Sequence, residues 1–197
     1  MRFPLVIIGG GLSGLAAAIR AARFIPDIIL VEKHSRLGGL NSYFYRNNIL
    51  FETGLHAITN FAKPDDKKAP LNRLLRQLKL RRDELSFCQQ LQSEIVFRDR
   101  ESLCFSNDFS LVSHEIKTKF PQTATKFDSL VNFVDSFDPF KSAPFRSTRT
   151  FLLEILEDPL LTEMLLCPLM FYGSSIEGDI DLSQFVIMFR AIFQEGM

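Results

Sequence analysis

The sequence of 197 residues contains no tryptophan and only three tyrosines and three cysteines, and its formal net charge is zero. Without an excess of positive charge there is no electrostatic footprint for nucleic acid, so we predict no nucleic-acid partner. Cys88, Cys104 and Cys167 are odd in number and lack the spacing of metal ligands, which indicates a reducing compartment and no metal site. We interpret each cysteine as a small core residue rather than a nucleophile.

Long apolar stretches are also missing. Although 46% of the residues are hydrophobic, no continuous run is long enough to cross a membrane. The first apolar segment begins within a few residues of Met1, which leaves no room for a signal peptide. These features predict a cytoplasmic protein.

Phenylalanine is the one residue in excess, with 20 copies. Composition alone favours a Phe-rich hydrophobic core. A deep apolar cavity or a surface that dips into a membrane would need the same residue type. Both interpretations stay open at this point.

The most informative segment lies at the N-terminus. Residues 5–8, Leu-Val-Ile-Ile, predict a buried strand, and the cluster Gly9, Gly10, Gly11, Leu12, Ser13 and Gly14 follows it. A small-residue helix then begins at Leu15, and a second apolar run over residues 28–31 ends at Glu32. A bare G-x-G-x-x-G is often no more than a glycine-rich turn. Here a strand precedes it, a helix follows and an acid ends the next strand, which together favour a dinucleotide-binding unit.

Each residue type in this unit has a chemical reason. Gly9 permits a tight turn, Gly11 leaves its backbone open to phosphate, and Gly14 lets the helix lie close to the strand. The helix N-terminus offers free N–H groups and a positive dipole end to an anion. Glu32 can accept hydrogen bonds from an adenosine ribose, and its charge would repel a 2′-phosphate, which disfavours NADP.

The remaining sequence predicts further elements and a domain boundary. Residues 33–41 read as a loop, and hairpins are expected around Asn47-Asn48 and around residues 98–101. The polar segment 63–70 predicts a seam between an N-terminal part of a nucleotide-binding domain, residues 1–62, and a substrate-binding segment, residues 63–197. Helices are expected from Pro70, around residues 127–137, and over 148–156, 159–166 and 183–195.

The predicted nucleotide sheet has only two parallel strands. Such sheets usually have several strands and are covered on both faces. We therefore expect this chain to be the N-terminal part of a longer protein. The predicted fold class is α/β, with an incomplete Rossmann-like strand–helix–strand unit and an inserted, mainly helical α+β substrate domain.

At residues 32–56 the sequence resembles the flavin-containing oxidoreductases that include amine oxidases, protoporphyrinogen oxidase and phytoene desaturases. The glycine fingerprint is followed by an acid, an arginine and a glycine pair, here Glu32, Arg36, Gly38 and Gly39. Residues 51–56, Phe-Glu-Thr-Gly-Leu-His, are similar to a motif of the phytoene desaturase, carotenoid isomerase and retinol saturase branch, although Glu52 stands where Asp is commoner. The resemblance covers about the first quarter of the chain.

The resemblance implies FAD as the cofactor and adds residues to the site. Gly38 and Gly39 would bring a second backbone segment to the cofactor, and the neighbouring Lys33, Leu40 and Asn41 join the predicted site. Arg36 would pair with phosphate or remain a solvated surface residue. His56 would lie near the flavin ring or serve as a buried structural histidine.

The resemblance also implies a function. No Ser-His-Asp or paired-carboxylate arrangement is visible, so no catalytic residue is assigned, as expected where the flavin carries the redox step. We expect an FAD-dependent oxidoreductase that desaturates, saturates or isomerises a hydrophobic, isoprenoid-like substrate. An amine oxidase-like enzyme and a non-catalytic escort protein that binds prenyl groups are the alternatives. Peripheral contact with the inner face of a membrane is a further hypothesis from the Phe excess.

Overall fold

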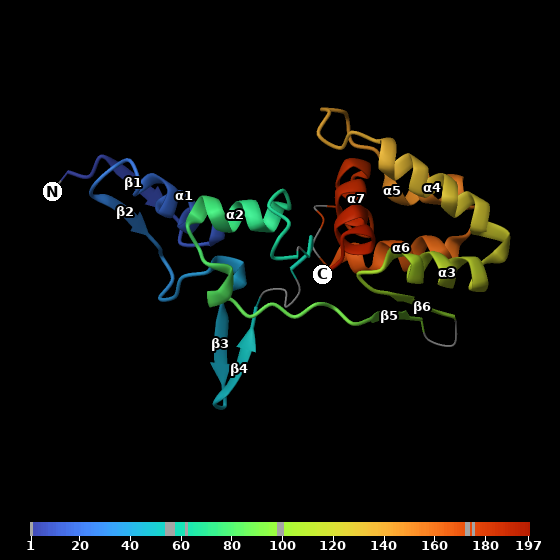
Figure 1. Ribbon diagram of the computed structural model, residues 1–197, viewed down its shortest axis with the longest axis horizontal. Coiled ribbons are helices and arrows are strands. Elements are labelled where there is room, and N and C mark those ends of the chain that lie inside the picture. Colours follow the sequence, from blue (N-terminus) through green and yellow to red (C-terminus); the bar gives the residue numbers. More distant parts are fainter. Residues whose placement is uncertain (1, 54–57, 62, 98–100, 172–173, 175) are drawn as a thin grey trace. The chain divides into compact units, whose positions relative to one another are not determined.

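The computed structural model describes residues 2–53, 58–61, 63–97, 101–171, 174 and 176–197. These residues fall into two compact units (Figure 1). The N-terminal unit comprises residues 1–58 and 62–86, and the C-terminal unit comprises residues 59–61 and 87–197.

The N-terminal unit begins with the expected strand–helix–strand motif. Strand β1 (Leu5–Ile8) leads through the glycine turn into helix α1 (Leu12–Ala21), which returns to strand β2 (Ile28–Val31). The two strands pair in parallel, with Leu5 opposite Ile28 and Ile8 opposite Val31. This pairing confirms the Rossmann-like prediction and brings the C-terminal ends of both strands to one edge, where ligands of such sheets bind.

A loop and a hairpin follow the motif. Gly39–Asn41 form one 3₁₀ turn within the expected loop, and strands β3 (Tyr43–Arg46) and β4 (Ile49–Glu52) pair antiparallel. Asn47 and Asn48 both have positive φ, at 52° and 61°, as the two-residue hairpin turn requires. The expected hairpin is therefore confirmed.

Helix α2 (Pro70–Leu78) begins at Pro70, as expected, and lies in the N-terminal unit. The compact N-terminal unit extends to residue 86, and the domain boundary expected at residue 62 stays a prediction. The buried side chains of α2 are Asn72 and Leu75.

The C-terminal unit holds the main hydrophobic core. Its elements are β5 (Ser93–Val96), β6 (Ser102–Phe105), α3 (Phe109–Lys119), α4 (Ala124–Ser136), α5 (Thr148–Leu156), α6 (Pro159–Met170) and α7 (Leu182–Phe189), and β5 pairs antiparallel with β6. Seven of the phenylalanines are buried in the protein, all of them in this core: Phe105, Phe120, Phe127, Phe151, Phe185, Phe189 and Phe193. A Phe-rich core thus accounts for about a third of the 20 phenylalanines.

Two expected helices differ from the structure in detail, one in its C-terminal end and one in the form of its last turns. Helix α6 runs past residue 166 and includes Pro168, because a proline near a helix end forfeits only one backbone hydrogen bond. The helix expected over residues 183–195 starts at Leu182, and its last part, Arg190–Gln194, is a π turn. The guanidinium of Arg190 donates there to the carbonyl oxygens of Val134 and Phe137 near the end of α4.

Candidate dinucleotide-binding site

The three fingerprint glycines between β1 and α1 meet three different constraints. Gly9 has a φ of +104°, which residues with a Cβ rarely adopt. A Cβ at Gly14 would lie 1.9 Å from the carbonyl oxygen of Gly9, so only glycine lets α1 pack this close to the turn. A Cβ at Gly11 would meet nothing nearer than the Cα of Gly39 at 3.8 Å, and the φ of Gly11 is −74°. Protein packing therefore does not require glycine at position 11, whereas a ligand that approaches the backbone there would.

The N-terminus of α1 is open to an anion. No side chain caps this helix, whose N-cap residue is Gly11, and its first turn contains no acidic residue. The N–H groups of Leu12, Ser13 and Gly14 have no acceptor within the helix because they belong to its first turn. The positive end of the helix dipole is consequently not compensated from within α1, and a phosphate would be stabilised there.

Glu32 lies directly against the glycine turn. The N–H of Gly10 donates to its Oε2 atom at 2.6 Å, and the N–H of His34 donates to its Oε1 atom at 2.8 Å. These backbone hydrogen bonds, that from His34 first and that from Gly10 second, lower the pKa of the Glu32 carboxyl. The side chain is therefore ionised at neutral pH. Each carboxylate oxygen keeps a second lone pair, with which it can accept a hydroxyl group.

The glycine pair packs on the same turn. The N–H of Gly38 donates to the carbonyl oxygen of Gly10 at 2.8 Å, and Gly38 forms a parallel β-bridge with Gly11. Gly38 and Gly39 have φ values of 116° and 61°, and a Cβ at Gly39 would come within 3.1 Å of the Cα of Gly11. The second glycine segment thus lies directly against the first, and a side chain at Gly39 would crowd the backbone of Gly11.

Thr53, just after strand β4 of the hairpin, forms hydrogen bonds with the backbone that follows the glycine pair. Its hydroxyl lies 2.8 Å from the carbonyl oxygen of Ser42 and 3.1 Å from that of Leu40, and it accepts the N–H of Ser42 at 3.2 Å. The hydroxyl therefore fixes the backbone that leaves the Gly38-Gly39 turn. Sequence reasoning did not assign Thr53 a role, although it stands inside the Phe-Glu-Thr-Gly-Leu-His motif.

A pocket of about 430 Å³ opens beside Glu32 and is also lined by His34, Ser35, Arg36, Gly39, Ser42, Tyr43, Phe44 and Thr53. The guanidinium of Arg36 donates to the carbonyl oxygen of Tyr43 at 2.6 Å and lies 4.9 Å from the centre of its ring. Cation–π stacking and this hydrogen bond hold Arg36 in place at the pocket wall. Tyr43 is a second residue that sequence reasoning missed.

The other residues of the predicted site are placed as follows. Lys33 and Asn41 are exposed, and the side chain of Leu40 is 87% exposed. None of these three side chains lines the pocket, although Leu40 contributes a carbonyl oxygen to Thr53. His56 lies outside the described residues, so its role stays a prediction.

Within the described part of the chain, no group of three His, Cys, Asp or Glu side chains could hold a metal ion. No helix in that part is both long enough and apolar enough to span a membrane.

Known proteins resemble the part of the chain that contains the glycine turn. Residues 7–78 match the NAD(P)-binding Rossmann-like domain family. A segment of 57 residues is 37% identical to all-trans-retinol 13,14-reductase from Homo sapiens, covering 29% of this chain and 9% of that protein. Another of 55 residues is 36% identical to a possible lysine-specific histone demethylase 1 from Drosophila melanogaster, covering 28% of this chain and 6% of that protein.

One solved structure extends the likeness to the whole fold. An oxidoreductase from Methanosarcina mazei superposes with a TM-score of 0.61 over 98% of this chain, at 17% sequence identity. The chain spans 44% of that protein's length. The glycine turn, the adjoining carboxylate and the family match lead to one conclusion: residues 7–78 form an NAD(P)-binding Rossmann-like segment, and the chain as a whole resembles the fold of an oxidoreductase.

Proposed function

We propose that the protein is an FAD-dependent oxidoreductase that acts on a hydrophobic, isoprenoid-like substrate. The observation that carries the proposal is the geometry around Gly11. Its backbone is open, the uncapped start of α1 lies directly after it, and the carboxylate of Glu32 is bonded to the neighbouring Gly10. A pyrophosphate and a ribose are the groups that such an arrangement fits.

The choice of FAD among dinucleotides rests on two features. The charge of Glu32 disfavours the 2′-phosphate of NADP. The Gly38-Gly39 segment places a second stretch of backbone beside the glycine turn. A large cofactor such as FAD would contact both stretches of backbone. Arg36 at the pocket wall would neutralise part of the pyrophosphate charge.

The substrate class rests on the relatives. The human relative is named as a retinol reductase, and retinol is an isoprenoid alcohol. We propose that the segment from residue 63 onward contributes to the substrate-binding domain, while residues 1–62 begin the cofactor domain. Peripheral contact with a membrane belongs to the same proposal, because an isoprenoid substrate would partition into lipid.

The roles of the chain's own residues follow. Gly11 and the N–H groups at the start of α1 would bind phosphate, and Glu32 would orient the ribose through hydrogen bonds. Gly38 and Thr53 would hold the turn in its bound geometry. The flavin, when bound, supplies the redox chemistry, and the protein supplies orientation and exclusion of water.

The flavin absorbance spectrum of the full-length protein tests the cofactor. Release of the bound cofactor by denaturation, followed by chromatography against FAD, FMN and NAD standards, identifies it. We expect FAD. A colourless protein that binds NADP and no flavin would contradict the proposal.

The Drosophila relative, named as a possible histone demethylase, favours an amine oxidase-like activity as the second candidate. Flavin reduction under anaerobic conditions by retinoids or carotenoids, compared with amines, separates the two. The intact glycine turn and Glu32 argue against a non-catalytic escort protein, in which the phosphate site would have no use.

A further inference from the structure

The formal net charge of zero conceals an uneven distribution. The N-terminal unit carries fourteen Lys and Arg against seven Asp and Glu, whereas the C-terminal unit carries nine against sixteen. The two units therefore have formal charges of +7 and −7. Because 0.1 M salt screens charges beyond about 10 Å, a local cluster acts on a partner whatever the total charge is.

The cations of the N-terminal unit concentrate near α2. Eight of the fourteen fall between residues 63 and 82. The acids of this stretch are largely engaged locally: Asp66 accepts the N–H groups of Lys68 and Ala69, and Asp83 pairs with Arg81. The exposed Arg73, Arg76 and Lys79 form a row along and just beyond the helix, and none of the three forms an ion pair with a residue that the structure describes, although Arg76 donates to the carbonyl oxygen of Lys67.

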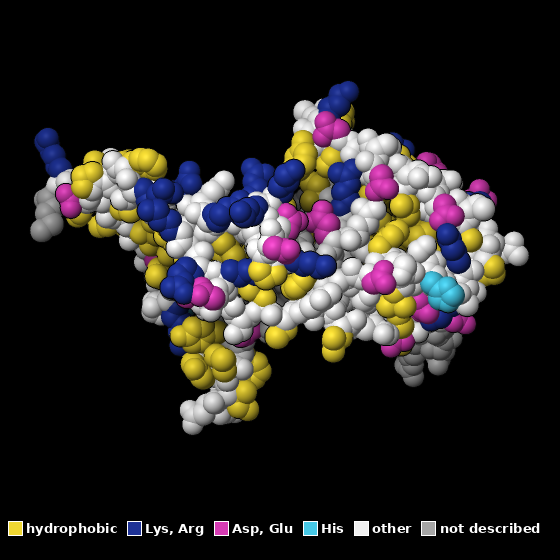
Figure 2. Space-filling view, in the orientation of Figure 1, with side chains coloured by type: hydrophobic (Ala, Val, Ile, Leu, Met, Phe, Trp, Pro, Cys, Tyr) yellow, Lys and Arg dark blue, Asp and Glu magenta, His cyan; other side chains and the backbone are white. Residues whose placement is uncertain are grey.

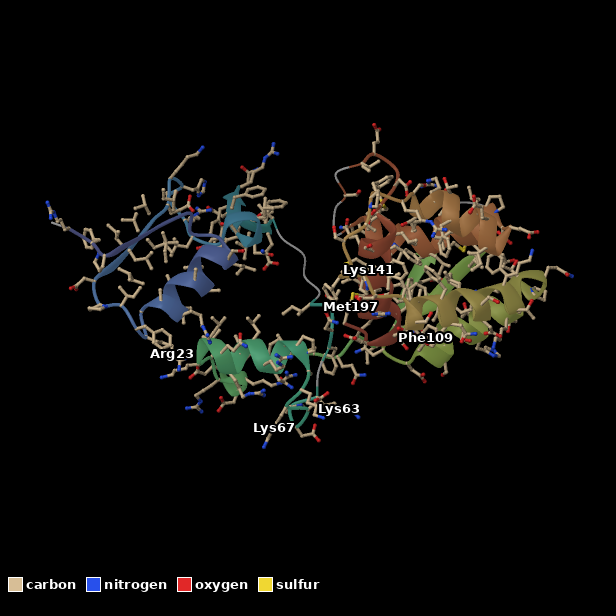
Figure 3. All side chains as sticks on the ribbon, turned by 90° about the horizontal axis from the view of Figure 1, so that it is seen from above. Arg23, Lys63, Lys67, Phe109, Lys141 and Met197 are labelled. Carbon is tan, nitrogen blue, oxygen red and sulfur yellow. The ribbon has the colours of Figure 1, made fainter. Side chains whose placement is uncertain are left out.

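Helix α1 adds two cations to this row. The guanidinium groups of Arg20 and Arg23 lie 3.4 and 3.3 Å from the carbonyl oxygen of Gln77, in the last turn of α2. Cations are stabilised at a helix C-terminus, which explains their position. Figure 3 shows Arg23 at one end of α2, with Lys63 and Lys67 at the other. We call Arg20, Arg23, Arg73, Arg76 and Lys79 the basic surface, and Figure 2 shows Lys and Arg side chains gathered over α1 and α2.

Large apolar side chains lie among these cations. Phe24 is 76% exposed, Leu74 is 48% exposed and Leu80 is 42% exposed. The guanidinium of Arg23 lies 5.8 Å from the centre of the Phe24 ring. Cations interleaved with exposed Phe and Leu are typical of surfaces that attract anionic headgroups and insert apolar side chains between them. A nucleic acid would use the cations and leave the aliphatic side chains without a partner.

We propose that the basic surface docks the protein on an anionic phospholipid membrane. The inference rests on the proposed function in one respect, since a lipid-dissolved substrate gives such docking a purpose. The binding itself depends only on the surface and can be measured without cofactor or substrate.

Sedimentation of the full chain with lipid vesicles tests the proposal. We expect binding to vesicles of phosphatidylcholine with about 30% phosphatidylserine, whose negative surface potential attracts basic residues, and little binding to phosphatidylcholine alone. Raising the salt concentration should release the protein. The double substitution Arg73→Glu and Lys79→Glu should weaken binding at least about tenfold, because each basic residue near an anionic surface contributes about fivefold.

A matched control changes the net charge equally in the other unit. Lys117 and Lys141 are on the surface of the C-terminal unit, and Lys117→Glu with Lys141→Glu should leave vesicle binding unchanged. Circular dichroism confirms that both variants are folded. Equal binding to the two kinds of vesicle, or equal loss in both variants, would overturn the proposal.

Two other partners would also overturn it. Tighter binding to a short RNA than to the vesicles would assign the surface to nucleic acid. A salt-sensitive dimer in analytical ultracentrifugation that the Arg73 and Lys79 substitutions abolish, without vesicle binding, would assign it to a second copy of the chain. A flavin spectrum of the same full-length preparations keeps failure of docking separate from failure of the cofactor proposal.

Discussion

Alanine at Gly11 should weaken cofactor binding and leave stability nearly unchanged, whereas alanine at Gly14 should lower stability, although both substitutions remove a fingerprint glycine. At Gly11 a Cβ finds no atom within 3.4 Å, and the extended backbone suits alanine. Replacing glycine at a helix N-cap costs about 0.5–1 kcal/mol, and the lower entropy of the unfolded chain returns about 0.4–1 kcal/mol. We therefore expect Gly11→Ala to change the free energy of unfolding by less than about 1 kcal/mol.

At Gly14 the added Cβ would lie 1.9 Å from the carbonyl oxygen of Gly9. The atom it meets is backbone, so the turn or the helix must move by more than ~1 Å to restore van der Waals contact. Overpacking of this kind costs about 3 kcal/mol, and the better helix propensity of alanine returns about 1 kcal/mol. For a unit of this size, a net loss of about 2 kcal/mol lowers the melting temperature by roughly 10 °C.

Thermal unfolding by circular dichroism measures the stability of both variants, and titration of the full-length protein with FAD measures binding. Gly11→Ala should melt like the wild type and bind FAD at least about tenfold more weakly, a loss of about 1.4 kcal/mol. Gly14→Ala should melt early. If Gly11→Ala binds FAD as tightly as the wild type, the space beside Gly11 is not a phosphate site.

Three further predictions concern neighbouring features. The lowered pKa of Glu32 means that its carboxyl group binds a proton less tightly in the folded protein than in the unfolded chain. The stability that this carboxylate contributes is therefore present above its unfolded pKa and is lost as the pH falls through its folded pKa. In an acid titration, Glu32→Gln should lose less unfolding free energy than the wild type does. Thr53→Val should lose about 0.5–1.5 kcal/mol of unfolding free energy in urea titrations while Thr53→Ser loses little, and equal losses would mean that the hydroxyl does not matter. Exposed Cys88 should react with iodoacetamide before Cys104 and Cys167, because burial raises the pKa of both of these thiols; peptide mass spectrometry gives the order.

Local chemistry explains what could be predicted from the sequence. The turn at Gly9, the strand ending at Glu32 and the hairpin at Asn47-Asn48 all depend on residues close together in the chain. Glycine conformation and apolar periodicity specify such features directly.

Contacts between segments explain what could not. The hydrogen bond from Gly38 to Gly10 and the clasp of Thr53 on Ser42 join residues that no periodicity relates. The hydrogen bonds from the guanidinium of Arg190 to carbonyl oxygens near the end of α4 join residues more than fifty positions apart. The opposite net charges of the two units depend on where the chain divides, and the formal total charge of zero does not indicate them.

The Gly38–Gly10 hydrogen bond couples the position of the Gly38-Gly39 segment to that of the glycine turn. Thr53 holds the backbone at Ser42, the same turn carries Gly38, and Gly38 bonds to the residue whose N–H also orients Glu32. A change in the hairpin would therefore reach the glycine turn between β1 and α1 through these contacts. Dinucleotide affinity in this protein should accordingly respond to substitutions some forty residues from the fingerprint, at positions that touch no cofactor atom.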